Sequence, residues 1–285
     1  MKTAVITGAT SGIGLAVAKT LCRQGYAILG VGRSQTKCDA ALKQIKTELP
    51  KSNAKLFCGD LAQQTDVNRL AEQISQHLDK NHDGKLDVLI NNAGGVRNWY
   101  TTTHEGYETQ FALNHLAGFL LTHRLLPHLS RAQGKMILTG SDSHKLMKMR
   151  WRDIMFKKRY SCLYAYKQSK LANLLFAKHF NDTLSDSNVR AYVVDPGLVN
   201  TDIGSKDTSG FVSWFWSKRA KHGVHPSVSA QTYAYICSEP NLTDLYYYRC
   251  EPKPHSKRVN SAGDAQRLWQ LSEQLCNIDY KEALS

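Results

Sequence analysis

The sequence predicts an α/β fold in which helices cover both faces of a mostly parallel sheet. Two observations indicate this fold class. Short apolar runs alternate with longer helical segments through the N-terminal half, which is the order that βαβ units follow. A glycine-rich loop also joins the first apolar run directly to a helix. No internal repeat and no Pro/Gly/Ser-rich linker divides the 285 residues, so we expect one domain spanning 1–285.

The apolar runs are predicted as strands, and the periodic segments between or after them as helices. The predicted strands are Thr3–Thr7, Ala27–Val31, Ala54–Cys58, Val88–Ile90, Lys135–Leu138 and Ala191–Val194. The predicted helices are Ile13–Arg23, Asp39–Leu49, Asp66–Leu78, Tyr107–Leu129 and Tyr164–Thr183.

The amino-acid composition limits the cellular compartment and the classes of partner that we expect. The chain holds 37 Lys and Arg against 24 Asp and Glu, a net charge of +13. Such a field attracts anions in general, but no recognised nucleic-acid-binding motif accompanies it, so we expect no nucleic-acid partner. Seven scattered cysteines without a Cys-x-x-Cys pair favour reduced thiols over a disulfide frame or a zinc site. The first residues lack the apolar core of a signal peptide, and no run approaches the roughly 18 apolar residues of a transmembrane helix. We expect a cytoplasmic protein without a metal site.

The stretch 79–87 matches the opening of a calcium-binding loop, with oxygen-bearing residues at 79, 81 and 83 before Gly84. The twelfth position, which should be Glu, is Ile90, and a strand follows where a helix is required. We interpret the stretch as a polar connection between a helix and a strand.

The glycine-rich loop after the first strand predicts a phosphate-binding turn. Its spacing is Gly-x-x-x-Gly-x-Gly, which differs from the usual Gly-x-Gly-x-x-Gly of dinucleotide sites. Glycines let the backbone approach a ligand closely, and the following helix offers unpaired N–H groups to a pyrophosphate. The glycines alone would suit a plain loop equally well, but their place at the first strand–helix junction favours a dinucleotide. The expected binding residues are Gly8, Ser11, Gly12, Ile13 and Gly14.

The end of the second strand indicates which dinucleotide is bound. An acidic residue there would bind the 2′-hydroxyl of NAD, whereas this chain has Arg33 and Ser34, with Lys37 nearby. Charge and a hydroxyl suit a 2′-phosphate, so the pattern favours NADP(H) over NAD(H); a solvated surface arginine is the alternative. The residues expected after the next two strands are Asp60 and Leu61 at the adenine, then Asn91, Ala93 and Gly94.

Tyr166 and Lys170 stand four residues apart on a predicted helix and share one face. A phenol beside an ammonium suits a general acid/base, because the cation favours the phenolate. Tyr160 and Tyr164 compete for the role, but only Tyr166 has a lysine four residues later. Taken alone, such a pair is more often a solvated surface contact.

Together these motifs resemble the short-chain dehydrogenase/reductase family. The matching stretches, in the family's order, are Thr7-Gly-x-x-x-Gly-x-Gly14, Asn91-Asn-Ala-Gly94, a serine after the fifth strand and Tyr166-x-x-x-Lys170. The resemblance covers essentially the whole chain. It is strongest to the retinol dehydrogenase-like branch, through Leu113–Thr122, Ser141–His144, Tyr166–Asn173 and Leu268–Ser272. It implies a single-domain, doubly wound Rossmann fold with a mostly seven-stranded parallel sheet and helices on both faces.

The resemblance also implies roles for individual residues. The catalytic tetrad would be Asn114, Ser141, Tyr166 and Lys170, the last two also binding the cofactor. Ser143 is a rival for the serine. Ser141 is preferred because, in the similar proteins, the catalytic serine precedes a histidine by three residues, as Ser141 precedes His144.

Asp195–Thr201 resembles the loop that closes over the nicotinamide in this family. The implied cofactor contacts are Pro196, Gly197, Val199 and Thr201, with Thr201 reaching the carboxamide. Asp195 stands where this branch more often has His, which leaves the surroundings of the substrate less defined.

The chemistry of hydride transfer agrees with these roles. Negative charge develops on the carbonyl oxygen, which needs hydrogen-bond donors in place and then a proton. Tyr166 would exchange that proton, and Ser141 would polarise the same oxygen. A free phenol has a pKa of about 10. An ammonium at ~4 Å is worth roughly 4 kcal/mol at an effective dielectric of ~20, or about three pKa units. Lys170 would also hold the nicotinamide ribose, and Asn114 a water that relays protons.

Two stretches combine basic and aromatic residues. Lys145–Arg159 interleaves seven basic residues with Met, Trp and Phe, and Gly210–Lys221 falls where the family places a substrate lid, near 202–226. Aromatics beside cations suit an apolar pocket that opens near a membrane surface. A core-packed helix and a solvated basic loop are the alternatives, and taken together they account for the pattern equally well.

The sequence therefore predicts an NADP(H)-dependent alcohol–carbonyl oxidoreductase (EC 1.1.1.-) acting on a lipophilic or retinoid-like compound. Peripheral membrane contact and a homodimer are both compatible with it. The alternatives are a reductase of a soluble biosynthetic ketone and a cofactor-binding regulatory or scaffold protein without turnover. The sequence leaves open the substrate, the preferred direction, the stereochemistry and the number of subunits.

Overall fold

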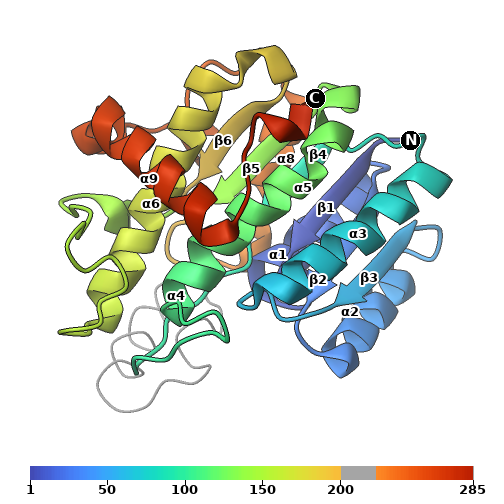
Figure 1. Ribbon diagram of the computed structural model, residues 1–285. Coiled ribbons are helices and arrows are strands. Elements are labelled where there is room, and N and C mark those ends of the chain that lie inside the picture. The colour runs from blue at the N-terminus through green and yellow to red at the C-terminus, as the bar shows by residue number, and fades with distance from the viewer. Residues whose placement is uncertain (200–222, 285) are drawn as a thin grey trace.

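A computed structural model of the chain describes residues 1–199 and 223–284 (Figure 1). Thr201, most of the lid expected near 202–226 and the basic-aromatic stretch 210–221 lie outside the described residues.

The first strand, β1 (Thr3–Thr7), is buried along its whole length and lies inside the sheet, between β2 and β4. In the part of the chain that the structure describes, one sheet has the order β3-β2-β1-β4-β5-β6-β7-β8. The other strands are β2 Ala27–Gly32, β3 Ala54–Cys58, β4 Val88–Asn91, β5 Lys135–Thr139, β6 Arg190–Val194, β7 Tyr246–Tyr248 and β8 Glu251–Pro252. Strands β1 to β7 pair in parallel, which confirms the predicted sheet, and the two-residue β8 adds an antiparallel edge.

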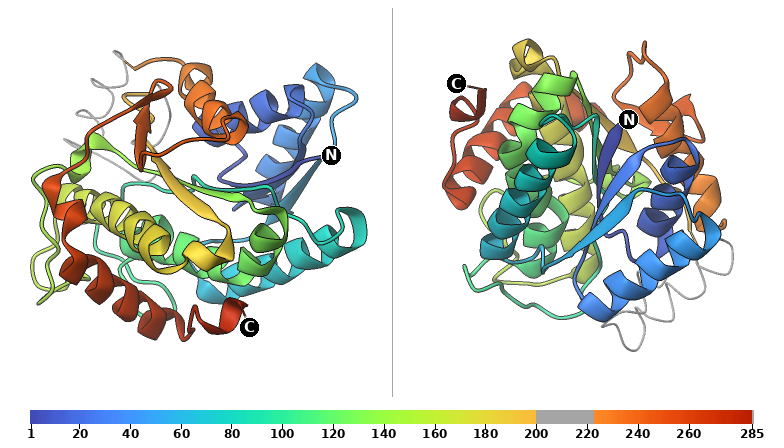
Figure 2. Two further views of the ribbon diagram at one scale, coloured as in Figure 1. Left: turned by 90° about the horizontal axis from the view of Figure 1, so that it is seen from above. Right: turned by 90° about the vertical axis from the view of Figure 1, so that its right-hand side faces the viewer.

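Helices cover both faces of this sheet (Figures 1 and 2). Their bounds are α1 Gly12–Arg23, α2 Gln35–Glu48, α3 Gln64–Asn81, α4 Thr109–Phe111, α5 Ala117–Ala132, α6 Cys162–Thr183, α8 Pro226–Ser238 and α9 Ala262–Cys276. Alternate residues of β1 serve different cores: Ile6 packs with α1 and α8, whereas Val5 packs in the larger core with α3, α5, α6 and α9. This alternation follows from the period of two along a strand.

The strand order reverses direction at β1. The chain runs from β1 outward to β2 and β3, then crosses back to β4 and continues to β5 and β6. In doubly wound sheets, the crevice at the carboxyl ends of the strands beside this reversal is where ligands bind. The loops after β1 and β4 therefore meet at the position that a site requires.

One predicted helix differs in detail. The segment expected as a helix over Tyr107–Leu129 begins at Thr109 and ends at Ala132. Between α4 and α5 lies a π-helical turn, Ala112–Leu116, in which the hydrogen-bonded turn is one residue wider. Such turns occur frequently at functional sites, and this one contains Asn114.

Candidate active site

The loop between β1 and α1 brings backbone groups close together. Gly8 and Gly12 have φ of +70° and +55°, a region that side chains with a β-carbon rarely adopt. A β-carbon added to Gly14 would lie 2.2 Å from the carbonyl oxygen of Gly8. The first turn of α1 carries no acidic residue, so its N–H groups and dipole remain suited to an anion.

Thr7 fixes the loop after β4 beneath this glycine turn. Its hydroxyl accepts hydrogen bonds from the backbone N–H groups of Asn92 and Ala93, each at 2.9 Å. The Asn92 amide in turn donates to the Thr7 carbonyl at 2.9 Å. Asn91 turns away and donates to Thr122 on α5 at 3.1 Å. Of the two asparagines, only Asn92, which the sequence analysis missed, lines the cavity described next.

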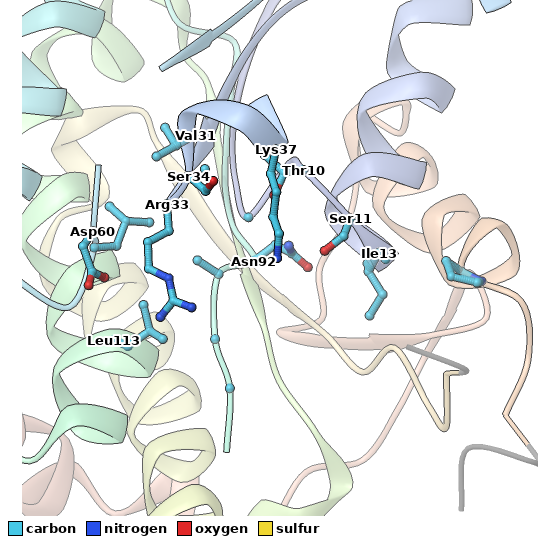
Figure 3. Close-up of a pocket in the computed structure, with 18 of the residues that line it drawn as sticks. Thr10, Ser11, Ile13, Val31, Arg33, Ser34, Lys37, Asp60, Asn92 and Leu113 are labelled. Atoms are coloured by element: carbon cyan, nitrogen blue, oxygen red, sulfur yellow. The ribbon is translucent and has the colours of Figure 1, made fainter. Parts of the chain in front are cut away.

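A cavity of about 690 Å³ opens between these loops, within the usual range for small-molecule sites of about 300–1,000 Å³. Figure 3 shows side chains from β2, α1 and the loops converging on it. Of the predicted cofactor residues, Gly8, Ser11, Gly12, Ile13, Arg33, Ser34, Asp60, Leu61, Ala93 and Gly94 line it. Other lining residues, which sequence reasoning did not select, are Thr10, Val31, Gly32, Gly59, Asn92, Gly95, Val96, Arg97, Leu113, Gly223, His225 and Pro226.

Positive charge is concentrated at one end of the cavity. Arg33 and Lys37 extend into it from the end of β2 and the first turns of α2 (Figure 3). Arg97 also lines the cavity, and Asp60 is the carboxylate in this lining. Ser34 stands at the N-terminus of α2 without using its side chain as a cap. This end of the cavity therefore presents cations and a hydroxyl to an anionic ligand.

Asn114 connects the helix to the loop after β4. Its Nδ2 donates to the Gly95 carbonyl and to Ser169 Oγ, both at 3.0 Å. Its Oδ1 accepts from the Gly95 N–H at 2.8 Å. The π-helical turn thus holds the amide against the wall of the cavity.

Lys170 is buried, with 3% of its surface exposed, and lies near the same wall. Its Nζ donates to the Thr139 carbonyl at the end of β5 at 2.9 Å and lies 5.5 Å from the centroid of the Tyr166 ring. A β-carbon added to Gly94 would be 3.7 Å from this Nζ and 3.0 Å from Asn114 Oδ1. Burial lowers the pKa of Lys170 to about 8, and Asp195 acts in the opposite direction. Tyr166 and Lys170 thus lie on the same face of α6, and their catalytic roles stay predictions.

The two candidate serines lie in a short turn after β5. Ser141 Oγ accepts a hydrogen bond from the Ser143 N–H at 3.2 Å. The Ser143 hydroxyl is buried and has no hydrogen-bond partner among the described residues. His144 is fully buried, and its Nδ1 lies 2.7 Å from the Ser141 carbonyl. The preference for Ser141 over Ser143 stays a prediction.

The loop after β6 begins at Asp195, whose side chain is almost entirely buried. The Pro196 carbonyl accepts a hydrogen bond from Ser229 on α8 at 2.7 Å. Gly197 has φ of +72°, and Val199 pairs with Val224. Pro196, Gly197 and Val199 are not among the lining residues of the cavity, so their cofactor contacts stay predictions.

The basic-aromatic segment 145–159 is largely a packed connection. Met147, Met149, Met155 and Phe156 are buried in the larger core, and Trp151 Nε1 donates to Asp264 on α9 at 3.0 Å. Core packing, one of the two plainer interpretations, therefore describes its apolar residues. Leu146 is the exception, with 98% of its surface exposed.

The stretch that resembles a calcium loop spans the end of α3 and the connection to β4. Asp79 lies 3.7 Å from Arg131 and 3.8 Å from His128. Across residues 1–199 and 223–284, no group of three or more His, Cys, Asp or Glu side chains could hold a metal ion. Within the same ranges, no helix has the length and apolar character needed to cross a membrane.

Comparison with known proteins agrees with this geometry. A family model described as short chain dehydrogenase matches residues 2–210. Retinol dehydrogenase 12 of Mus musculus is 33% identical over 284 residues, which cover 98% of this chain and 88% of the relative. The crystal structure of an uncharacterised protein from Mycobacterium paratuberculosis is similar, with 30% identity, a TM-score of 0.76 and coverage of 98% of this chain and 95% of that one. A short-chain dehydrogenase from Sphingobium yanoikuyae in complex with NADPH shares the fold, with a TM-score of 0.66, 21% identity and 96% of each chain covered.

The family match covers most of the chain, and the glycine loop and the loop after β4 line one cavity in the fold. The protein therefore belongs to the short-chain dehydrogenase/reductase family of oxidoreductases and resembles its retinol dehydrogenase-like branch.

Proposed function

We propose that this protein is an NADP(H)-dependent oxidoreductase that interconverts an alcohol and a carbonyl by hydride transfer, with Tyr166 as the general acid/base. The observation that carries the proposal is the position of the buried Lys170 ammonium, 5.5 Å from the Tyr166 ring centroid and beside Gly94 at the cavity wall. A cation so placed favours the phenolate over the phenol.

The residues present fit a dinucleotide with a 2′-phosphate. The glycine loop leaves room that a β-carbon would fill at Gly14, and α1 presents its N-terminus behind it. Arg33 and Lys37 supply positive charge where the adenosine ribose would lie. The NADPH complex of the Sphingobium relative supports this choice by analogy of fold.

The bound cofactor would supply or accept the hydride. Tyr166 would give a proton to the substrate oxygen in reduction and take it back in oxidation. Ser141 would donate a hydrogen bond to the same oxygen, where negative charge develops. Lys170 would hold the nicotinamide ribose, and Asn114 would keep the Gly95 backbone in place while it positions a proton-relaying water.

The substrate is proposed to be lipophilic. Trp99, Tyr100 and Leu198 are exposed on loops that follow β4 and β6, at the carboxyl edge of the sheet. Exposed apolar side chains on these loops suit an aldehyde, ketone or retinoid-like compound. The retinol dehydrogenase relatives support the same class. Peripheral membrane contact and a homodimer are also proposed, on the sequence alone.

The test is an NADPH-oxidation screen across retinal, medium-chain aldehydes, steroids and quinones, with Tyr166→Phe run beside the wild type. We expect turnover of a lipophilic carbonyl and a loss of at least about 100-fold in Tyr166→Phe, because general acid/base catalysis contributes about 10²–10⁴-fold. NADPH affinity, measured by nicotinamide fluorescence, should change little.

The matched control is Tyr164→Phe, because Tyr164 lies on the same helix and is 55% exposed. This variant should retain wild-type turnover. Unchanged turnover in Tyr166→Phe would remove Tyr166 from its role. NADPH binding without turnover of any compound would favour a cofactor-binding regulatory protein.

A further inference from the structure

The residues that follow β8 cross over both loops on the substrate side of the site. Lys253 Nζ lies 2.7 Å from Asp142 Oδ2, one residue after Ser141, and 2.6 Å from Asp195 Oδ2, at the start of the loop after β6. One ammonium therefore joins two loops that are more than 50 residues apart in the sequence.

The Asp195 carboxylate is fully engaged by this arrangement. One oxygen accepts from Lys253, and the other accepts from the Gly197 N–H at 2.9 Å. Tyr248 on β7 covers Gly197 so closely that an added β-carbon would lie 2.9 Å from its ring. The Lys253 ammonium lies 4.5 Å from the centroid of the same ring.

The same segment reaches the Ser141 turn a second time. The Ser256 N–H donates to His144 Nε2 at 3.0 Å. Because Nε2 accepts, the neutral imidazole carries its proton on Nδ1, which then donates to the Ser141 carbonyl at 2.7 Å. The turn that holds Ser141 is thus tied to the segment through both Asp142 and His144.

Asp195 also acts on the proton-handling pair. Its charge raises the pKa of Lys170 against the lowering caused by burial. An unpaired carboxylate here would oppose a phenolate on Tyr166. The described elements bring further titratable groups to this region, namely Tyr233 on α8, Tyr246 and Tyr248 on β7, Asp142, His144 and Lys145 after β5, and His255 after β8.

We propose that Lys253 is a positioning residue of this site, which holds the Asp195 loop against the Ser141 turn and neutralises the Asp195 carboxylate beside Lys170. The proposal rests on the proposed function, since it concerns the acid/base pair Tyr166 and Lys170. Lys253 would act on them only through Asp195 and would not touch the substrate.

The test is a charge-removal cycle with Lys253→Met, Asp195→Asn and the double variant, assayed for alcohol oxidation as a function of pH. In Lys253→Met the buried carboxylate stays uncompensated, so we expect the acidic limb of kcat/KM to move up by about one pH unit. The double variant removes both charges, so the acidic limb of kcat/KM should return toward its wild-type pH. Lys253→Arg keeps the positive charge and should leave the acidic limb at its wild-type pH.

Lys145→Met is the matched control, because Lys145 pairs with Asp142 at 3.0 Å but makes no ion pair with Asp195. It should leave the pH profile in place. A wild-type profile in Lys253→Met would overturn the proposal, and so would a shift that persists in the double variant. If the wild type oxidises no alcohol, the proposed function fails, and the melting temperatures of the same four proteins still decide the pairing. Non-additive changes in melting temperature between the single and double variants support the pairing of Lys253 with Asp195, and additive changes contradict it.

Discussion

The proposed nucleotide end and the proposed substrate end of the candidate site are built from different chemical groups. At the nucleotide end, the walls are backbone: Gly8, Gly12 and Gly14 leave space, and the exposed side chains of Arg33 and Lys37 supply charge from the rim. At the substrate end, the charges themselves are buried. Lys170 and Asp195 are 3% and 4% exposed, and their partners come from distant parts of the chain.

This difference predicts different sensitivities. Where the wall is backbone, stability and ligand binding should be sensitive to an added β-carbon and should depend little on pH. A wall made of buried charges should respond to pH and to the removal of one partner, because an unpaired buried charge is costly. Three substitutions separate these responses.

The largest effect is expected for Gly14→Ala. The added β-carbon would lie 2.2 Å from the Gly8 carbonyl oxygen and 2.7 Å from Asn92 Nδ2, so the glycine turn must move. We expect a loss of about 1–3 kcal/mol in the free energy of unfolding and no measurable NADPH binding. Urea unfolding and nicotinamide fluorescence measure the two.

Gly263→Ala is the control for that substitution. Gly263 lies in the first turn of α9, and nothing stands within 4 Å of an added β-carbon. It should be neutral or stabilising by up to about 1 kcal/mol. Equal effects of the two substitutions would mean that the turn at Gly14 is not tightly constrained.

Lys170→Met tests the buried charge. Burial lowers the pKa of Lys170 from 10.5 to about 8. Between these values the unfolded chain binds more protons than the folded one, so the free energy of unfolding rises with pH there. Below pH 8 the buried ammonium costs up to about 3 kcal/mol, partly offset by its hydrogen bond to Thr139.

We therefore expect Lys170→Met, without cofactor, to be more stable than the wild type at pH 7 and to lose that advantage between pH 8 and 10.5. Urea unfolding across this range measures the difference. Lys178→Met is the control, since Lys178 lies on the same helix and pairs with Asp182 at the surface. A stability difference at Lys170 that does not change with pH would contradict the interpretation.

Arg33→Ala is expected to have a smaller effect, confined to one cofactor. Losing a hydrogen bond to a charged phosphate costs about 1.5–3 kcal/mol, so the KM for NADPH should rise roughly 10- to 100-fold while that for NADH changes little. Steady-state kinetics with both cofactors measure the ratio. Arg23→Ala, at the far end of α1, should change neither. Equal effects on both cofactors would remove the 2′-phosphate from Arg33.

The nucleotide end could be predicted largely from sequence, because most of its residues stand in short stretches directly after a strand. Strands β1 and β3 have the predicted bounds, and β2 extends one residue further. Buried runs with β-branched residues specify β1 and β2 locally, and each run is followed by a glycine or ends in one. Helix α2 begins at Gln35, four residues before the predicted start, and Ser34 occupies the N-cap position without a side-chain hydrogen bond to the helix.

The substrate end could be predicted only in part. Tyr166 and Lys170 share one helix, so spacing finds them. Lys253 carries no motif, and its partners Asp142 and Asp195 meet it only because β5, β6, β7 and β8 are neighbours in the sheet. The short strands are defined by their neighbours in the sheet, since β7 pairs with β6 and β8 pairs with β7.

The π-helical turn Ala112–Leu116 makes the position of Asn114 depend on the exact number of residues in its helix. Each residue of a helix advances about 100° around the axis. Removing a single residue from this turn could restore regular α-helical bonding, yet it would rotate Asn114 away from Gly95 and Ser169. A surface loop can accommodate the loss of one residue, whereas in this helix the loss would break the contacts of Asn114 with the cavity wall. The number of residues between Thr109 and Ala132 therefore determines where Asn114 lies.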